Sequence, residues 1–166
     1  MVIEIGCTKV IQTPLGDIAL SASDDALVEL TFLTGNAKRL DFSNSERAAR
    51  QVDSAANWLQ SYFTGDKSDY QGKLNLGGTA FQQAVWHEIS TIKHGQTLTY
   101  GEIAHRIGKP QASRAVGAAV GANPIPLIIP CHRVMGSGGK ITGYSGGDGI
   151  PTKRKLLLLE KIEFSE

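Results

Sequence analysis

Residues 123–134 carry the sequence NPIPLIIPCHRV, and the rest of the chain is organised around this stretch. Its three prolines fix the backbone torsion at their own positions and bias each preceding residue toward extended geometry. The apolar run at 127–129 favours burial. The stretch therefore predicts a rigid, buried segment that ends on a thiol, Cys131. A base, His132, and a cation that favours the thiolate, Arg133, follow directly.

The composition is that of an ordinary water-soluble globular protein. The chain has 166 residues, 41% hydrophobic and 20% charged, which is enough for one full-sized domain or two small ones. No apolar run approaches the length that spans a bilayer, and residues 1–6 lack the basic region and apolar core of a signal peptide. We therefore expect a cytoplasmic protein with no membrane partner. There, Cys7 and Cys131 are expected as free thiols, Cys7 acting only as a small apolar residue.

The net charge of +1 conceals a division between the two halves of the chain. Residues 1–76 carry 7 Lys and Arg against 10 Asp and Glu, a net charge of −3; residues 77–166 carry 10 against 6, a net charge of +4. A polyanionic partner is therefore expected to meet the second half.

The first half, residues 1–76, predicts an α/β domain. Short β-like segments between residues 7 and 33 are separated by Pro, Gly and Asp, which indicates an antiparallel meander. A helix is expected to follow, capped by Ser43 with Glu46 three residues later and ending at Gly65. The segment 65–78, rich in Gly, Asp, Ser, Lys and Asn, is the expected boundary between domains.

The second half, residues 77–166, predicts a mostly helical domain, so the whole chain is assigned to the α+β class. Capping boxes begin helices at Thr79 and Thr99, and a helix of small residues is expected over 111–122. The helix that begins at Thr99 and the helix over 111–122 have helix-turn-helix spacing. The small residues favour close helix packing, and a close approach to DNA is the alternative explanation. The glycine-rich segment 135–147 favours a lid or a pocket wall over a phosphate cradle.

The Cys131-His132 pair alone leaves several chemistries open. The histidines have no ligand-like spacing and the two cysteines lie far apart, so no metal site is expected. A Cys/His acyl-transfer enzyme remains conceivable. However, neighbouring side chains on an extended segment point in opposite directions. His132 would then reach the sulfur only through a turn or a bridging water.

A longer sequence pattern around Cys131 indicates which of these chemistries applies. Ile129–Val134 (IPCHRV) resembles the active-site signature of the O6-alkylguanine-DNA alkyltransferases. The likeness continues in the family's order and spacing at 81–86, 99–104 (TYGEIA), 113–117 (SRAVG), 123–124, 143–147 (GYSGG) and 157–160 (LLLE). It covers nearly all of residues 77–166, and in residues 1–76 it is limited to the strand-then-helix order.

The resemblance implies DNA repair without a cofactor. A thiolate takes the alkyl carbon of O6-alkylguanine, with O4-alkylthymine as a second candidate substrate, and the restored base leaves. The resulting thioether has no easy reverse reaction, so the protein acts once, as a methylated-DNA–protein-cysteine S-methyltransferase. The partner implied is double-stranded DNA, bound through the minor groove with the damaged nucleotide flipped out. We expect a monomer and leave cooperativity on DNA open.

The same resemblance implies roles for particular residues. Cys131 is the nucleophile, His132 the base acting through a water, and Glu160 the carboxylate that orients His132, although a lone Glu in a helix is usually a solvated charge. Tyr100 donates to N3 of the purine. The residues implied in DNA or substrate binding are Arg114, which fills the space left by the flipped base, Ser113, Ala115, Asn123, Val134, Tyr144 and Ser145.

Two departures from the family pattern are visible. Gly121 stands where some relatives carry an arginine, and residues 147–151 form a longer, acidic connection to the last helix. Relatives with tryptophan at the cysteine position only bind lesions, and Cys131 speaks against that class. The competing hypotheses are a non-catalytic lesion-binding or regulatory helix-turn-helix protein and a multiple-turnover Cys/His hydrolase.

Overall fold

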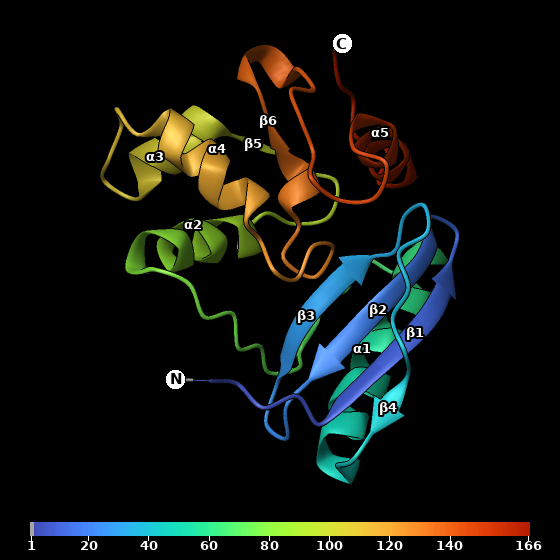
Figure 1. Cartoon of the computed structure of the whole chain (residues 1–166). Coiled ribbons are helices and arrows are strands. Elements are labelled where there is room, and N and C mark those ends of the chain that lie inside the picture. Colours follow the sequence, from blue (N-terminus) through green and yellow to red (C-terminus); the bar gives the residue numbers. More distant parts are fainter. Residues whose placement is uncertain (1) are drawn as a thin grey trace. The chain divides into compact units, whose positions relative to one another are not determined.

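A computed structural model describes residues 2–166 of the chain. The chain divides into two compact units, Met1–Leu76 and Gly77–Glu166, which are described in turn (Figure 1). Within residues 2–166, no helix combines the length and the apolar character needed to cross a membrane.

An antiparallel sheet forms one layer of the first unit. Strands β1 (Cys7–Thr13), β2 (Gly16–Ala22) and β3 (Leu27–Phe32) make the predicted meander. A short strand that the sequence did not predict, β4 (Phe42–Ser43), pairs with β1, so the sheet order is β3-β2-β1-β4. The segment 73–75 also runs beside β3, because Leu27 exchanges backbone hydrogen bonds with Lys73 and Asn75.

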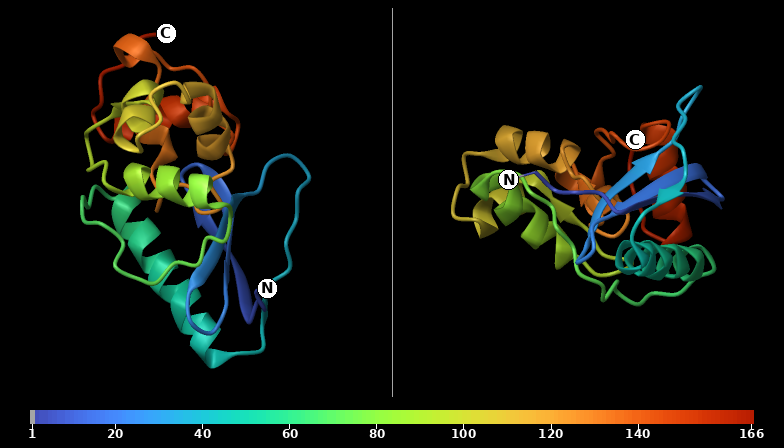
Figure 2. Two further views of the ribbon diagram at one scale, coloured as in Figure 1. Left: turned by 90° about the vertical axis from the view of Figure 1, so that its left-hand side faces the viewer. Right: turned by 60° about the horizontal axis from the view of Figure 1, so that its bottom comes forward.

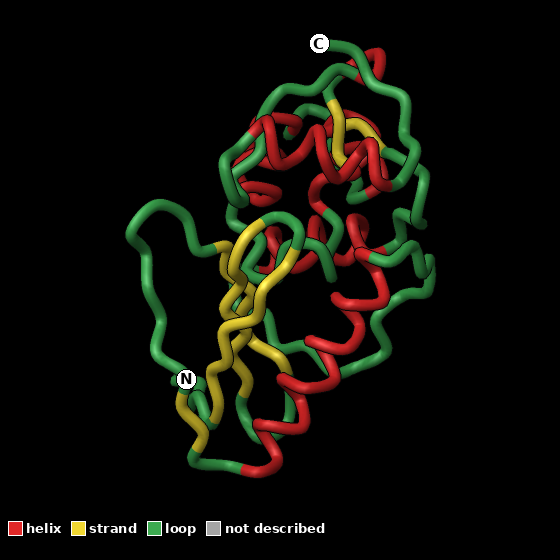
Figure 3. The backbone as a smooth tube through the Cα atoms, turned by 90° about the vertical axis from the view of Figure 1, so that its right-hand side faces the viewer, coloured by secondary structure: helices red, strands yellow, loops and turns green. Residues whose placement is uncertain are grey.

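Helix α1 (Glu46–Phe63) forms the second layer and lies along one face of this sheet, as Figures 2 and 3 show. Its buried stripe recurs at helical spacing: Ala48, Val52, Ala55, Leu59 and Tyr62. The helix is capped by Ser45, whose side chain accepts a hydrogen bond from the backbone of Ala48. The expected cap at Ser43 is wrong, because Ser43 is the last residue of β4 and is still paired with β1.

The second unit is mostly helical. It contains α2 (Ala80–Ser90), α3 (Tyr100–Arg106), α4 (Ser113–Gly121) and α5 (Ile150–Leu159). The capping boxes predicted at Thr79 and Thr99 are confirmed, with Gln82 and Glu102 as their reciprocal partners. Helices α3 and α4 pack against each other as the predicted helix-turn-helix. Trp86 of α2 supports them by donating a buried hydrogen bond of 2.8 Å to the carbonyl of Ala119.

Short elements connect the helix-turn-helix to the proline-rich stretch. A 3₁₀ turn, η1 (Cys131–Arg133), leads directly into strand β6 (Val134–Met135). Strand β6 pairs in parallel with β5 (Leu98–Thr99), and a second 3₁₀ turn, η2 (Ser137–Gly139), follows. Because Thr99 also caps α3, this pairing places the start of the helix-turn-helix beside the thiol-bearing turn.

Candidate active site

The proline-rich stretch is rigid and largely buried, but it is not extended throughout. Leu127 adopts a φ of +75° in the left-handed region and is 1% exposed, so buried packing holds a conformation that a non-glycine residue rarely adopts. Ile129 then donates a backbone hydrogen bond of 2.9 Å to Ile125, and the chain enters the 3₁₀ turn at Cys131. The extended geometry expected at the thiol is therefore wrong, since a tight turn forms there instead.

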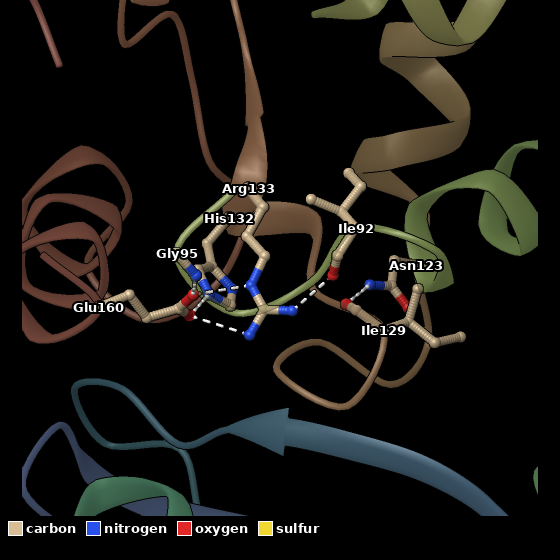
Figure 4. A network of polar contacts seen from close by, with 7 residues as sticks. All are labelled: Ile92, Gly95, Asn123, Ile129, His132, Arg133 and Glu160. Atoms are coloured by element: carbon tan, nitrogen blue, oxygen red, sulfur yellow. Dashed lines mark hydrogen bonds and ion pairs between the residues drawn. The ribbon is translucent and has the colours of Figure 1, made fainter. Parts of the chain in front are cut away.

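Asn123 fastens this loop to the end of α4. Its side-chain amide donates to the carbonyl of Ile129 at 2.8 Å, and its side-chain oxygen accepts from the backbone of Ile125 at 3.0 Å. One side chain thus closes the loop from both ends, two residues beyond the last residue of α4 (Figure 4).

Glu160, at the C-terminal end of α5, is the centre of a buried polar network (Figure 4). Arg133 donates to its carboxylate through Nε at 2.8 Å and Nη2 at 3.2 Å, and the backbone of Gly95 donates at 3.1 Å. The Nε2 atom of His132 contacts Oε2 of Glu160, the same oxygen that accepts from Nη2 of Arg133. Glu160 is only 3% exposed, so the usual expectation of a solvated charge is wrong at this position.

The electrostatics of this network define the state of His132. Burial opposes ionisation of Glu160, but hydrogen bonds and positive charge from His132 and Arg133 outweigh it and hold the pKa of the carboxyl well below its usual range. Burial lowers the pKa of His132 in spite of the opposing contact with Glu160. A neutral imidazole beside an ionised carboxylate must donate from Nε2. The Nδ1 atom of His132 then carries the lone pair and can act as a base.

Arg133 was expected to be the cation beside the sulfur, and the structure assigns it another position. Its guanidinium is bonded to Glu160 and, through Nη1, to the carbonyl of Ile92 at 2.7 Å. The cation that acts on the Cys131 sulfur is Lys153 of α5. Sequence reasoning missed this residue. The available signal was helical spacing, because Lys153 lies three and four residues before the buried Leu156 and Leu157.

The resting nucleophile is a protonated thiol. Burial raises the pKa of Cys131, which is 3% exposed. Hydrogen bonding by Asn123 and Tyr144 and the positive charge of Lys153 act in the opposite direction without cancelling the effect. A nucleophilic reaction at this sulfur therefore requires a base that takes its proton.

The thiol opens onto a cavity of about 290 Å³, near the lower end of the usual range for small-molecule sites. Its walls come from the helix-turn-helix, the 3₁₀ turn and the glycine-rich loop: Tyr100, Gly117, Val120, Gly121, Cys131, Gly143, Tyr144 and Ser145. The sequence interpretation of residues 135–147 as a pocket wall is thus confirmed for Gly143–Ser145. The structure brings three of the predicted site residues, Tyr100, Tyr144 and Ser145, to the same cavity as Cys131.

The remaining predicted residues lie around this cavity or on the surface of α4. The carbonyl of Val134 accepts from Lys153 and retains a second lone pair, and the hydroxyl of Ser145 donates to the carbonyl of Gly121 at 3.1 Å. Arg114 and Ala115 are exposed in the first turn of α4, and Ser113 begins that helix. None of these three lines the cavity.

The site combines a cavity with one wall from the helix-turn-helix, a buried thiol that lines this cavity, and a neutral histidine next to the thiol in the chain. This combination defines a class of protein. Such a protein performs nucleophilic cysteine chemistry at a nucleic-acid-binding fold. Two family models match the chain and identify which family this is. The model described as 6-O-methylguanine DNA methyltransferase, DNA binding domain, matches residues 80–162, and the corresponding ribonuclease-like domain matches residues 7–76. The chain belongs to the 6-O-methylguanine DNA methyltransferase family.

Individual relatives agree with this assignment. A methylated-DNA–protein-cysteine methyltransferase of Mycobacterium tuberculosis is 44% identical over 155 residues, which cover 92% of this chain and 91% of the relative. The protein of the same name from Methanosarcina acetivorans is 41% identical, covering 91% and 96%. The crystal structure of Mycobacterium tuberculosis OGT in complex with DNA matches with a TM-score of 0.81 at 44% identity, covering 93% of this chain and 92% of that one.

The buried pair of His132 and Glu160 predicts a loss of stability in acid. In the unfolded chain a histidine titrates near pH 6.5, whereas folded His132 has a lowered pKa, so below about pH 6.5 the unfolded state binds the extra proton. Glu160 adds to the effect below about pH 4.3, because its folded pKa is also lowered. We expect the free energy of unfolding of the second unit to fall with a slope approaching about 1.4 kcal/mol per pH unit.

Urea denaturation from pH 7.5 to 4.5 measures this slope, with Trp86 as the fluorescent reporter in a Trp58→Phe background. His132→Asn should flatten the curve between pH 6.5 and 5, while His87→Asn, on the exposed face of α2, should leave it unchanged. A curve that keeps its slope without His132 contradicts the buried neutral imidazole.

Proposed function

We propose that this protein repairs DNA by moving the alkyl group of O6-alkylguanine onto Cys131, once per molecule. The observation that carries the proposal is the buried thiol at a cavity bounded by the helix-turn-helix. The thiolate attacks the alkyl carbon, a carbon–sulfur bond forms, and the bond from that carbon to O6 breaks. The guanine leaves as its anion and takes up one proton, so the proton lost by the thiol is balanced. The chemistry uses no cofactor and no metal.

His132 and Glu160 prepare the nucleophile. The raised pKa of Cys131 keeps the resting sulfur protonated, and Nδ1 of His132, acting through a water, is the base that removes the proton. Glu160 supports this role from the opposite side of the ring, because its contact with Nε2 selects the tautomer and fixes the ring. Arg133 stabilises the charge of the carboxylate in turn.

Tyr100 assists the departing base. It lines the cavity with Cys131, and its hydroxyl accepts a hydrogen bond of 3.4 Å from Thr142, which leaves its own proton available for donation. We assign this donation to N3 of the purine, where it offsets the charge that develops as the base leaves. Four further residues hold and read the base. Asn123 fixes the loop before the thiol, and Tyr144 and Ser145 line the cavity that receives the base. The carbonyl of Val134, next to the 3₁₀ turn, has a second lone pair available to the base.

Helix α4 places the protein on double-stranded DNA. Apart from Arg114, its exposed face is made of small residues, which permit close approach of the backbone in the minor groove. Arg114 enters the duplex and occupies the space of the flipped nucleotide, flanked by Ser113 and Ala115. We place the protein in the cytoplasm as a monomer, where reducing conditions keep Cys131 a thiol.

Incubation with duplex DNA containing O6-methylguanine should add one methyl group to Cys131 and to no other residue. Mass spectrometry of the tryptic peptide 115–133 detects the change, and Cys131→Ser, with the peptide of Cys7 as an internal reference, is the control. An unmodified Cys131 in protein that binds the DNA would favour the non-catalytic lesion-binding class. More than one lesion repaired per chain would indicate a turnover enzyme.

Replacing Arg114 should separate repair in DNA from reaction with a free base. Arg114→Ala should slow transfer from duplex DNA about ten- to a hundredfold, which corresponds to the loss of about 1–3 kcal/mol of DNA contact. Reaction with O6-benzylguanine should be unchanged, because Arg114 does not line the cavity. Arg47→Ala, an exposed arginine of α1, is the matched control. Equal losses on both substrates would refute the assignment of Arg114.

A further inference from the structure

The proposed mechanism uses the hydroxyl of Tyr100 but not the residue that holds this hydroxyl, Thr142. The Oγ1 atom of Thr142 donates a hydrogen bond of 3.4 Å to it, although the two residues lie 42 positions apart in the chain. Within residues 2–166, Thr142 is the one side chain that hydrogen-bonds to the Tyr100 hydroxyl. Thr142 does not line the cavity itself, so its contact with the site is made through Tyr100.

The methyl group of Thr142 packs against the backbone of Gly136. A Cβ atom at position 136 would lie only 2.6 Å from Cγ2 of Thr142, so this methyl group occupies space that only a glycine leaves open. Gly136 is held in turn, because its backbone donates to the carbonyl of Lys140 at 2.8 Å. The methyl group and the hydroxyl of a threonine stand on the same Cβ, so seating one of them also fixes the other. The hydroxyl is thereby directed to Tyr100.

The backbone that carries Thr142 is also held in place. The preceding residue, Ile141, is 6% exposed and packs in an apolar cluster with Met135 and Leu157. Its backbone donates a hydrogen bond of 2.9 Å to the carbonyl of Ser165. Thr142 is exposed, yet both its backbone and its side chain are attached to buried parts of the second unit. Its hydroxyl is therefore a fixed donor.

A fixed donor at Thr142 gives the Tyr100 hydroxyl a direction. A phenol hydroxyl has one proton to donate and lone pairs that accept, so a hydroxyl that accepts from Thr142 keeps its own proton for another acceptor. Tyr100 lines the cavity with Cys131, and we assign its proton to N3 of the purine. The two hydrogen bonds then run in one direction, from Thr142 through Tyr100 to the purine. Hydrogen bonds in such a chain polarise and strengthen one another.

We propose that Thr142 is a positioning residue for the alkyl transfer, which directs the proton of the Tyr100 hydroxyl toward N3 of the departing purine; this inference rests on the proposed function. Without the donor at Thr142, the phenol proton is free to point away from the cavity toward water. Negative charge develops on the purine as the bond from the alkyl carbon to O6 breaks. The bond to N3 therefore stabilises the transition state more than the bound substrate, and its loss lowers the rate of transfer.

A lesion that lacks the purine N3 separates this role from a structural one. O6-methyl-3-deazaguanine carries a C–H group in place of N3 and cannot accept the proton. Thr142→Val removes the hydroxyl and keeps the shape, so it should slow single-turnover transfer from O6-methylguanine in duplex DNA about three- to tenfold. On the 3-deaza lesion in the same duplex, Thr142→Val should react at the rate of the unchanged protein. Thr142→Ser keeps the hydroxyl and should recover most of the lost rate on O6-methylguanine.

A merely structural threonine gives a different result. Thr142→Val would then slow transfer from both lesions by the same factor, and this outcome overturns the proposal, as does an unchanged rate on O6-methylguanine. A double-mutant cycle adds a second criterion. In Tyr100→Phe protein, Thr142→Val should cause no further loss, whereas losses that add show that Thr142 acts independently of Tyr100 and overturn the proposal. Thr34→Val, at an exposed threonine after β3, is the matched control.

Equilibrium binding keeps the test separate from the proposed reaction. Cys131→Ser protein lacks the thiol, and its affinity for duplex DNA with either lesion is measured with and without Thr142→Val. The protein with Thr142 should prefer O6-methylguanine to the 3-deaza lesion, and Thr142→Val should reduce this preference about two- to fivefold. A preference that Thr142→Val leaves unchanged overturns the positioning role. The proposed function fails separately, when Cys131 stays unmodified in the mass measurement.

Discussion

The ionised carboxylate of Glu160, buried at the end of α5, is the constraint on which the active site depends. It can remain ionised without water only because Arg133, His132 and the backbone of Gly95 all donate to it. Removing one partner of such a buried group costs about 3–5 kcal/mol. The network therefore joins α5, the 3₁₀ turn that carries the buried Cys131 thiol and the loop before β5 into one rigid assembly.

Rigidity at the thiol is transmitted to the helix-turn-helix through backbone pairing. Strand β6 follows the turn and pairs with β5, whose last residue, Thr99, caps α3. Asn123 closes the other side, between α4 and the loop that leads to Cys131. The helix-turn-helix and the Cys131 sulfur, which we propose to attack the alkyl carbon, are therefore held in one frame. Such a frame suits a reaction in which the base is brought to the sulfur rather than the reverse.

Local signals in the sequence predicted much of this fold. The meander, the capping boxes at Thr79 and Thr99 and the helix-turn-helix depend on residues a few positions apart, and all were confirmed. Strand β4 has only two residues and depends on its distant partner β1, so no local pattern predicts it. The cap at Ser45 was misassigned because Ser43 and Ser45 both offer a hydroxyl, and only the pairing of β4 decides between them.

The sequence predicted some active-site contacts and missed others, because those contacts join residues that are far apart in the chain. The resemblance named His132 and Glu160, which the structure brings into contact, whereas adjacency in the chain suggested Arg133 as the partner of the sulfur. The 3₁₀ turn directs Arg133 to Glu160 instead. Lys153 is 22 residues beyond Cys131, and its role depends on how α5 packs, which the sequence pattern alone does not specify.

The protonation state of His132 decides whether this residue can act as the base for the Cys131 thiol. ¹⁵N NMR of the imidazole distinguishes the two neutral tautomers and the imidazolium. We expect a neutral ring at pH 7 with the proton on Nε2, where it faces Glu160, and an unprotonated Nδ1. An imidazolium at pH 7, or a proton on Nδ1, would contradict the role of His132 as the base, because His132 could then not accept the proton of Cys131.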